Sequence, residues 1–234
     1  DFIMSILLDY PDFETLMMGL AKIVAKQLGQ ALSDKGQATL AVPGGTTPAP
    51  FLERLSLMEM DWENITVLMT DERLQPADLF RSNYRMVDHY LSQNASTKAQ
   101  ILPMATVDQT PEEALKAATV LYKPHLPIDV LVVGMGADMH TASLFPDAHE
   151  LSAALSADAP PLMVINSASQ PEQRLTLTAP VLSAAKNSHL LITGPEKLAA
   201  FIKAEEGDGP VAEAPIRCVL QGANMAMVHH TLGK

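Results

Sequence analysis

Apolar side chains recur every three or four residues between Phe13 and Leu28, which is the spacing of one buried face of an α-helix. Asp12 precedes this segment as an N-cap, and Gly36 follows it where a left-handed residue ends a helix. Similar patterns predict four further helices, namely Pro48 to about Leu57 with Thr47 as its N-cap, Asn83–Leu91, Pro111–Tyr122 and Pro195–Ala204.

Short, continuous apolar runs separate these helices. Five of them predict strands, at Ala38–Val42, Ile65–Met69, Ile128–Val133, Leu162–Ile165 and His189–Thr193. Because the runs are not interrupted by regular polar positions, both faces of each strand are expected to be covered, as in a parallel sheet between two layers of helices. The loop Glu205–Pro210 is too short to link two domains, so residues 1–234 are predicted to form one α/β domain.

Four of the predicted strands run directly into loops that contain glycine or charged residues. These loops are Pro43–Thr47, Thr70–Arg73, Gly134–His140 and Gly194–Lys197. The carboxyl ends of parallel strands lie at the same edge of a sheet, and ligands of such sheets bind at that edge. We therefore expect all four loops to converge on one crevice.

Charge and cysteine content limit the classes of partner. The chain has 16 Lys and Arg against 27 Asp and Glu, a formal net charge of -11. This balance argues against nucleic acid or an anionic membrane surface as partner, although a few local cations can still bind a small anion. The single cysteine excludes an internal disulfide, no apolar run reaches the ~20 residues that span a bilayer, and the start lacks a basic signal region. A cytoplasmic protein is predicted, and its oligomeric state stays open.

Two loops carry candidate chemistry. Gly44, Gly45 and Thr46 form either a simple tight turn or a turn whose backbone binds an anion, and no Walker lysine follows them. Asp138 and His140 are two residues apart, so in an extended loop both side chains point the same way. Their carboxylate and imidazole suit a general base held in one tautomer, but a capping acid beside a polar histidine is the structural alternative.

Other motifs are interpreted as structural or absent. The segment Gly134–Met139 lacks the third glycine of a dinucleotide fingerprint, and no histidine or cysteine spacing matches a metal site, so neither cofactor nor metal is expected. Ser143 lacks a nucleophile elbow and is interpreted as structural. Cys218 is predicted to be a buried, inert thiol. The pair His229 and His230 is predicted to be a solvated chain end.

Three cations are candidates for binding an anion: Arg73, Arg174 and Lys197. Arg174 begins the alternating, strand-like run Leu175–Thr178, so it belongs to the start of an element rather than to a solvated charge cluster. Arginine suits bidentate contact with phosphate, and lysine supplies a point charge. An acidic protein that binds a phosphorylated sugar needs such residues in one place.

The segment Gly134–Pro146 closely resembles the Gly-Met-Gly-X-Asp-Gly-His-Thr-Ala-Ser-Leu-Phe-Pro signature of the 6-phosphogluconolactonases. Agreement extends, in chain order, to Pro43–Pro48, to Trp62–Tyr84 with Asp71-Glu72-Arg73, and to Arg174–Thr178 followed by Gly194–Lys197. The resemblance implies a Rossmann-like, three-layer α/β/α sandwich with a mostly parallel central sheet. It also implies hydrolysis of 6-phospho-D-glucono-1,5-lactone in the pentose phosphate pathway.

The resemblance implies roles for individual residues as well. His140 would be the general base with Asp138 in support, and phosphate would be held by the turn Gly44-Gly45-Thr46 with Arg174 and Lys197. Asp71 and Arg73 would face the sugar ring or the reacting carbonyl.

Two departures and two alternatives accompany the resemblance. Met139 replaces the usual glycine before the histidine, which would crowd the pocket if its φ is positive, and Asp147 replaces a glycine at the edge of the loop. Glucosamine-6-phosphate deaminase has a similar loop, but Thr141–Pro146 matches the lactonases. A sugar-phosphate sensor without turnover is the alternative from a different class, and only Met139 favours it.

Overall fold

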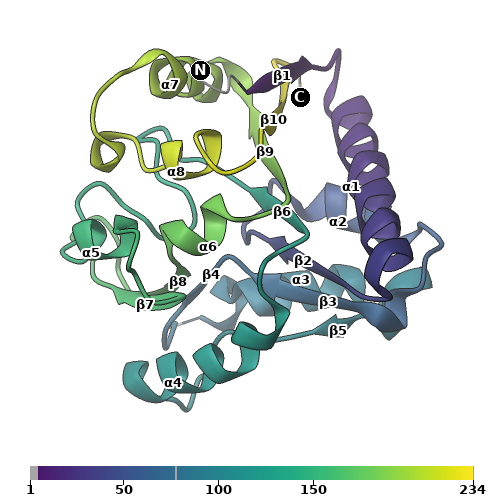
Figure 1. The fold of residues 1–234 in the computed structure, drawn as a ribbon, viewed down its shortest axis with the longest axis horizontal. Coiled ribbons are helices and arrows are strands. Elements are labelled where there is room, and N and C mark those ends of the chain that lie inside the picture. Colours follow the sequence, from purple (N-terminus) through teal and green to yellow (C-terminus); the bar gives the residue numbers. More distant parts are fainter. Residues whose placement is uncertain (1–4, 77, 234) are drawn as a thin grey trace.

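A seven-stranded sheet forms the middle layer of the computed structural model, which describes residues 5–76 and 78–233 (Figure 1). Every pair of neighbouring strands in this sheet runs parallel, and β2, β3 and β6 are buried at all their positions. The parallel sheet predicted from the uninterrupted apolar runs is therefore confirmed. The strand order is β1 (Ile6–Asp9), β10 (Ala226–Thr231), β9 (Asn187–Thr193), β6 (Val130–Val133), β2 (Ala38–Val42), β3 (Ile65–Met69) and β5 (Gln100–Ile101).

Helices cover both faces of this sheet. On one side α1 packs on α2 and α2 packs on α3, whereas on the other side α7 and α6 pack against α8 (Figure 1). This is the three-layer α/β/α sandwich that the resemblance implied. The helices are α1 (Phe13–Lys35), α2 (Ala49–Ser56), α3 (Asn83–Leu91), α4 (Pro111–Tyr122), α5 (Leu151–Leu155), α6 (Ala179–Ser183), α7 (Gly194–Glu206) and α8 (Arg217–Leu220).

The helix ends follow local capping chemistry, with one correction. The Asp12 side chain accepts a hydrogen bond from the Thr15 N–H at 2.7 Å and caps α1, and Gly36 ends that helix in the left-handed conformation. The prediction of Thr47 as the N-cap of α2 was wrong. Pro48 occupies that position with helical dihedral angles, so Thr47 stays outside the helix and faces a cavity described below.

A second, smaller sheet corrects the predicted topology. Leu162–Ile165 is a strand, as predicted, but this strand, β7, pairs antiparallel with β8 (Arg174–Leu177) outside the main sheet. The segment Thr70–Arg73 was predicted as a polar loop, yet Asp71–Arg73 forms β4, which also pairs antiparallel with β8. No glycine or proline follows β3 here, and the chain bends only at Thr70 before it enters the second sheet.

The C-terminal strand β10 was missed, and the prediction of a solvated end at His229 and His230 was wrong. Both rings are fully buried. The two histidines interrupt the apolar run of β10, so the sequence pattern did not predict this strand. Each buried ring is hydrogen-bonded to polar groups of neighbouring elements. Cys218 is buried, as predicted, and burial raises the pKa of its thiol to about 12.

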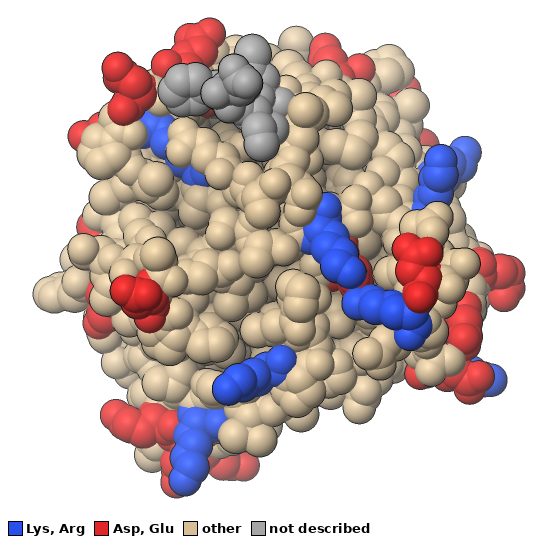
Figure 2. Space-filling view, in the orientation of Figure 1, with Lys and Arg blue, Asp and Glu red and all other residues tan. Residues whose placement is uncertain are grey.

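Charged side chains are sparse on the face seen in Figure 1. Figure 2 shows Lys and Arg there as separate residues in a largely uncharged surface, with no continuous basic patch on this face. Within residues 5–76 and 78–233, no helix has the length and apolar composition needed to cross a membrane. Residues 1–4, which begin the segment judged to lack a signal region, lie outside the described part of the chain.

Candidate active site

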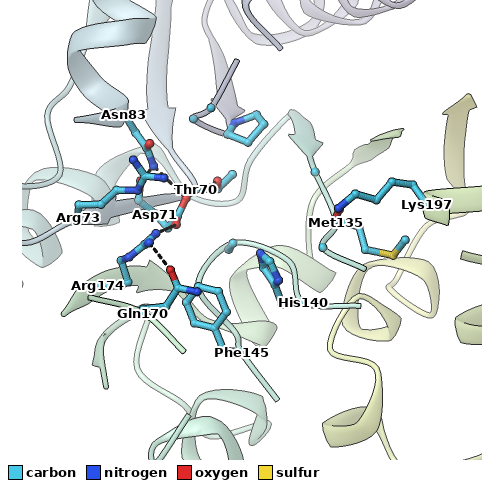
Figure 3. A pocket seen from close by; sticks show the side chains of 16 residues that line it. Thr70, Asp71, Arg73, Asn83, Met135, His140, Phe145, Gln170, Arg174 and Lys197 are labelled. Atoms are coloured by element: carbon cyan, nitrogen blue, oxygen red, sulfur yellow. Dashed lines mark hydrogen bonds and ion pairs between the residues drawn. The ribbon is translucent and has the colours of Figure 1, made fainter. Parts of the chain in front are cut away.

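The strand order places a switch point between β2 and β6. From β2 the chain proceeds through β3 to β5 on one side, and from β6 it proceeds through β9 to β10 on the other. Loops that follow the two strands at such a point diverge and leave a crevice. A cavity of about 340 Å³, here called the main cavity, lies between them (Figure 3).

All four predicted loops reach the main cavity, so their convergence is confirmed. Each contributes lining residues: Gly44 and Gly45, Asp71 and Arg73, Gly134 to Gly136 with His140, and Lys197. A smaller cavity of about 160 Å³ adjoins it and shares Gly44, Gly45 and Lys197; Thr46 lines this one only. Of the predicted site residues, only Asp138 lines neither cavity.

Asp138 instead contacts the His140 ring at Nδ1, outside the cavity. Its Oδ1 lies 2.6 Å from the Nδ1 atom of His140 and also accepts the backbone N–H of His140 at 3.1 Å. A carboxylate beside Nδ1 keeps the proton on that nitrogen and leaves Nε2 able to accept one. The imidazole packs on Phe145 with ring centroids 4.6 Å apart and remains partly exposed to the main cavity.

Hydrogen bonds within the loop hold this ring in place. The Gly136 N–H donates to the His140 carbonyl at 3.0 Å, and the Thr141 hydroxyl donates to the Gly134 carbonyl at 2.8 Å. A Cβ atom added to Gly136 would overlap the His140 ring and the Asp138 carboxylate. Glycine at 136 is therefore required by the close approach of the His140 ring and the Asp138 carboxylate.

Gly136→Ala is expected to lower catalytic turnover without unfolding the protein, because the methyl group must push the His140 ring or Asp138 out of place. With His140 as the general base that the resemblance implies, displacement of the ring would lose roughly the 10²-fold or more that positioned proton transfer provides. Steady-state kinetics would show the fall in kcat, and circular dichroism would check the fold. A Gly136→Ala enzyme with unchanged kcat would mean that the position of this ring does not matter.

Met139 takes the left-handed conformation that the usual glycine would permit. Its φ is +65°, a backbone conformation that costs a non-glycine residue about 1–2 kcal/mol. The loop keeps its path because the Ile216 N–H donates to the Met139 carbonyl at 3.0 Å and the side chain packs on the hydrophobic core. Met139 does not line the main cavity, so the expected crowding is absent there.

The other departure from the family pattern, Asp147, is hydrogen-bonded to the neighbouring loop that contains Ser167 and Ser169. Its carboxylate accepts hydrogen bonds from the Ser167 hydroxyl at 2.5 Å and from the Ser169 N–H at 2.9 Å, and these bonds, with that from Ser167 first, lower its pKa. The next residue along, Gln170, lines the main cavity and accepts a hydrogen bond from Arg174 at 2.6 Å. Asp147 thus orders the segment that carries Gln170.

Asp71 lies at the centre of a buried network. Its Oδ2 accepts a 2.6 Å hydrogen bond from the Ser143 hydroxyl and lies 3.7 Å from Nη1 of Arg174, while the Asn83 amide donates to its Oδ1 at 3.2 Å. Ser143 is fully buried, and its N–H donates to the Thr176 hydroxyl, so its structural interpretation agrees with the geometry. The network joins the His140 loop to the small sheet.

Two arginines stand side by side in this region. Arg73 and Arg174 are direct partners in the pairing of β4 with β8, a position where like charges repel. Burial lowers the pKa of Arg174, with Asp71 raising it and Arg73 lowering it further. Among the described residues, the buried Nε atoms of both arginines have no hydrogen-bond partner. Both arginines also line the main cavity, and two guanidinium groups there suit an anionic ligand.

Lys197 occupies the other side of the main cavity. Its Nζ donates to the Met135 carbonyl at 2.7 Å, next to the glycine turn that also lines the smaller cavity. Figure 3 shows Arg174 and Lys197 on opposite sides of His140. The cations therefore share one cavity, but they do not form a single cluster.

Sequence reasoning missed Asn83, Phe145 and Gln170 as lining residues. Asn83 begins α3 and packs so closely on Gly44 that a Cβ atom there would overlap its amide. Its position after the N-cap Ser82 was a usable signal, because helix starts often face ligands. No signal marks Gln170, because its approach depends on how the small sheet folds. Within the described residues, no group of three or more His, Cys, Asp or Glu is placed to hold a metal.

Comparison with known proteins assigns the family. Residues 11–228 match the model of the glucosamine-6-phosphate isomerases/6-phosphogluconolactonase family. A 6-phosphogluconolactonase of Mesorhizobium japonicum is 39% identical over 92% of this chain and 90% of its own length, and one of Pseudomonas aeruginosa is 43% identical over 78% of each. The crystal structure of a 6-phosphogluconolactonase from Shewanella baltica, 31% identical, superimposes with a TM-score of 0.92 over 98% of this chain and 99% of that one. The chain therefore belongs to the family of glucosamine-6-phosphate isomerases and 6-phosphogluconolactonases.

Proposed function

We propose that this protein hydrolyses 6-phospho-D-glucono-1,5-lactone to 6-phospho-D-gluconate, the lactonase step of the oxidative pentose phosphate pathway. The observation that carries the proposal is the 2.6 Å contact between Asp138 and His140, with the imidazole exposed to a cavity that has cations on both sides. Relatives named 6-phosphogluconolactonase and the segment Thr141–Pro146 support this reaction over deamination.

In the proposed mechanism, His140 acts as general base through Nε2. It takes a proton from water as the water oxygen bonds to the lactone carbonyl carbon, and Asp138 stabilises the imidazolium that results. The carbonyl oxygen becomes an oxyanion, which the positive charge of Arg73, a lining residue of the main cavity, would stabilise. The bond to the ring oxygen then breaks, and that oxygen takes the proton back from His140. A lactone is an activated ester, so neither a metal nor a covalent intermediate is required.

The phosphate is proposed to lie at the turn Gly44-Gly45-Thr46 beside Lys197, where the smaller cavity joins the main one. Arg174 adds positive charge from the other side of the main cavity and thereby strengthens attraction for the anionic substrate. Asp71 holds Arg174 in place and has little free accepting capacity left, because Ser143 and Asn83 already donate to it.

Arg174→Ala is expected to raise KM for the phosphorylated lactone by roughly tenfold while kcat changes less, because a charge that attracts substrate is lost. Michaelis–Menten analysis at constant ionic strength would separate the two parameters. Arg174→Lys, which keeps the charge but not the forked geometry, is the matched comparison. A fall in kcat with unchanged KM would place Arg174 at the reacting carbonyl instead of in phosphate attraction.

An assay with freshly prepared lactone tests the function. Purified protein should remove 6-phospho-D-glucono-1,5-lactone faster than its spontaneous hydrolysis. Release of ammonia from glucosamine 6-phosphate would indicate the deaminase instead. Binding of 6-phosphogluconate without any acceleration would indicate a sensor, and the proposal would then be wrong.

Three predictions from the sequence accompany this proposal. We propose that residues 1–234 act as one domain, that the protein works in the cytoplasm, and that neither nucleic acid nor a membrane is its partner. Net charge and the site for a small anion support the last of these.

A further inference from the structure

A buried histidine lies close to the proposed phosphate end of the site without touching it. His230, on β10, is fully buried, and both of its ring nitrogens face oxygen atoms. Nδ1 lies 2.9 Å from the Asp9 carboxylate at the end of β1, and Nε2 lies 3.2 Å from the Gly194 carbonyl at the start of α7. The ring therefore bridges an edge strand and the first residue of a helix.

The two contacts fix the position of the ring. The Asp9 carboxylate holds it on the Nδ1 side, and the Gly194 carbonyl lies on the Nε2 side. Because the ring is fully buried between them, loss of the contact with Asp9 would free one side of the bridge and let the ring and the start of α7 shift.

The Gly194 side of this bridge leads to the proposed phosphate site. Thr193, the residue before Gly194, lines the smaller cavity, and Lys197 stands in the first turn of α7 and lines both cavities. The position of the Lys197 ammonium is set partly by its hydrogen bond to the Met135 carbonyl, in the loop that follows β6. A small shift at the start of α7 would move this ammonium relative to the glycine turn.

We propose that His230, held in place by Asp9, is a positioning residue that fixes the start of α7 and thereby sets the affinity of the site for the phosphate of its substrate. This inference rests on the proposed function for the identity of the substrate. It assigns a role in substrate binding to Asp9, whose side chain is mostly exposed and lies outside both cavities.

The positioning role of His230 can be tested separately from any role of its neighbour His229, because the two side chains have different surroundings. Among the described residues, Asp9 is the ionisable side chain hydrogen-bonded to His230. The Tyr10 N–H, directly after β1, donates to the His230 carbonyl at 2.8 Å. His229 is next to it in β10 and points to the opposite face of the sheet, where it contacts Tyr10 and His189. His229 therefore offers a control with equal burial on the same strand.

The test compares two lactones. In Asp9→Asn, KM for 6-phospho-D-glucono-1,5-lactone is expected to rise about 5- to 10-fold, the loss expected when a charge-assisted contact weakens. KM for unphosphorylated D-glucono-1,5-lactone and kcat should stay near the wild-type values. Asp9→Glu should restore affinity because it keeps the carboxylate, and His230→Gln should resemble Asp9→Asn. The control His229→Gln should lower stability without changing the ratio of the two KM values.

A double-mutant cycle shows whether the effect passes through Lys197. In a Lys197→Ala background, Asp9→Asn should add little, because the group that it positions is gone. An equal increase in KM with and without Lys197 would overturn the inference. So would a parallel change for both lactones, which would indicate a general structural role.

Binding of inorganic phosphate, measured by calorimetry, keeps this test apart from the proposed function. Weaker phosphate binding by Asp9→Asn in a protein that hydrolyses neither lactone would support the positioning role and reject the lactonase proposal. Normal lactone turnover combined with unchanged phosphate binding in Asp9→Asn would support the lactonase proposal and reject the positioning role.

Discussion

His140→Ala is expected to lower kcat for lactone hydrolysis by about 10²- to 10⁴-fold, the range that a positioned general base contributes. The imidazole is exposed to the main cavity, Asp138 holds its proton on Nδ1, and Phe145 supports the ring from one side. No other histidine lines the main cavity, so within the described residues nothing of the same chemistry can replace it. Residual activity should therefore come from substrate binding and oxyanion stabilisation alone.

Binding should survive this substitution. The cations and the glycine turn do not depend on the imidazole for their contacts, so the dissociation constant for 6-phosphogluconate should change little. Stopped-flow lactone consumption, corrected for spontaneous hydrolysis, measures the rate, and calorimetry measures binding. His149→Ala, which removes an exposed histidine outside the main cavity, should leave the rate unchanged. A His140→Ala enzyme as fast as the wild type would refute the assignment of the base.

Acidification below about pH 6.5 is expected to destabilise the fold through His189 and His229. The two rings form a buried chain in which the Tyr10 hydroxyl donates to His229, His229 donates to His189, and His189 donates to Gln27. Each ring is neutral in this chain. A further proton on Nδ1 of His189 would place two N–H groups against each other, and one on Nδ1 of His229 would displace the hydrogen bond that the Tyr10 hydroxyl donates. Burial, followed by the charge of His229, lowers the pKa of His189 to about 3, and burial lowers the pKa of His229 to about 4.

The sign follows from proton uptake on unfolding. In the unfolded chain these histidines bind protons below about pH 6.5, whereas in the folded protein they do so only below about pH 4 and 3. Stability is therefore complete above pH 6.5 and decreases as pH falls, by about 1.4 kcal/mol per pH unit for each histidine. Between pH 7.5 and pH 5.0 the two together should cost about 4 kcal/mol.

Urea unfolding at the two pH values measures this loss. The double variant His189→Gln/His229→Gln should be less stable at pH 7.5 but should lose less stability on acidification, because the groups that gain protons on unfolding are absent. If the double variant does not fold, His229→Gln alone should show about half of the effect. Identical pH dependence in wild type and variant would show that these rings do not govern acid stability.

Periodicity predicted the parallel sheet well because its strands are buried on both faces and consist almost entirely of apolar residues. Ala38–Val42 and Ile65–Met69 were correct to the residue, as were Asn83–Leu91 and Pro111–Tyr122, where a capping residue and a regular apolar face agree. The strand Ala226–Thr231 escaped because its histidines are stabilised by partners far away in the sequence. Such long-range pairing leaves no local signal.

The site was partly predictable for a similar reason. Because parallel strands end at one edge of a sheet, the sequence alone predicts that the loops at Gly44, Asp71, Gly134 and Lys197 meet. The same rule did not predict that Arg174 and Lys197 lie on opposite sides of the main cavity. Arg174 begins β8, which pairs with β4 in an antiparallel sheet, and the apolar pattern did not distinguish that sheet from the main one. The roles of the individual side chains in binding and turnover stay predictions until the kinetic tests are done.

A single residue, Thr70, separates β3 from β4, and this short connection constrains how the site can change in evolution. Side chains alternate along a strand, so Asp71 and Arg73 face the main cavity while Glu72 points away and accepts the N–H groups of Asn83 and Tyr84. An insertion or deletion of one residue here would exchange the two sets, turning Glu72 into the cavity and Asp71 and Arg73 out of it. Descendants of this chain can therefore tolerate altered side chains at this junction more readily than an altered residue count.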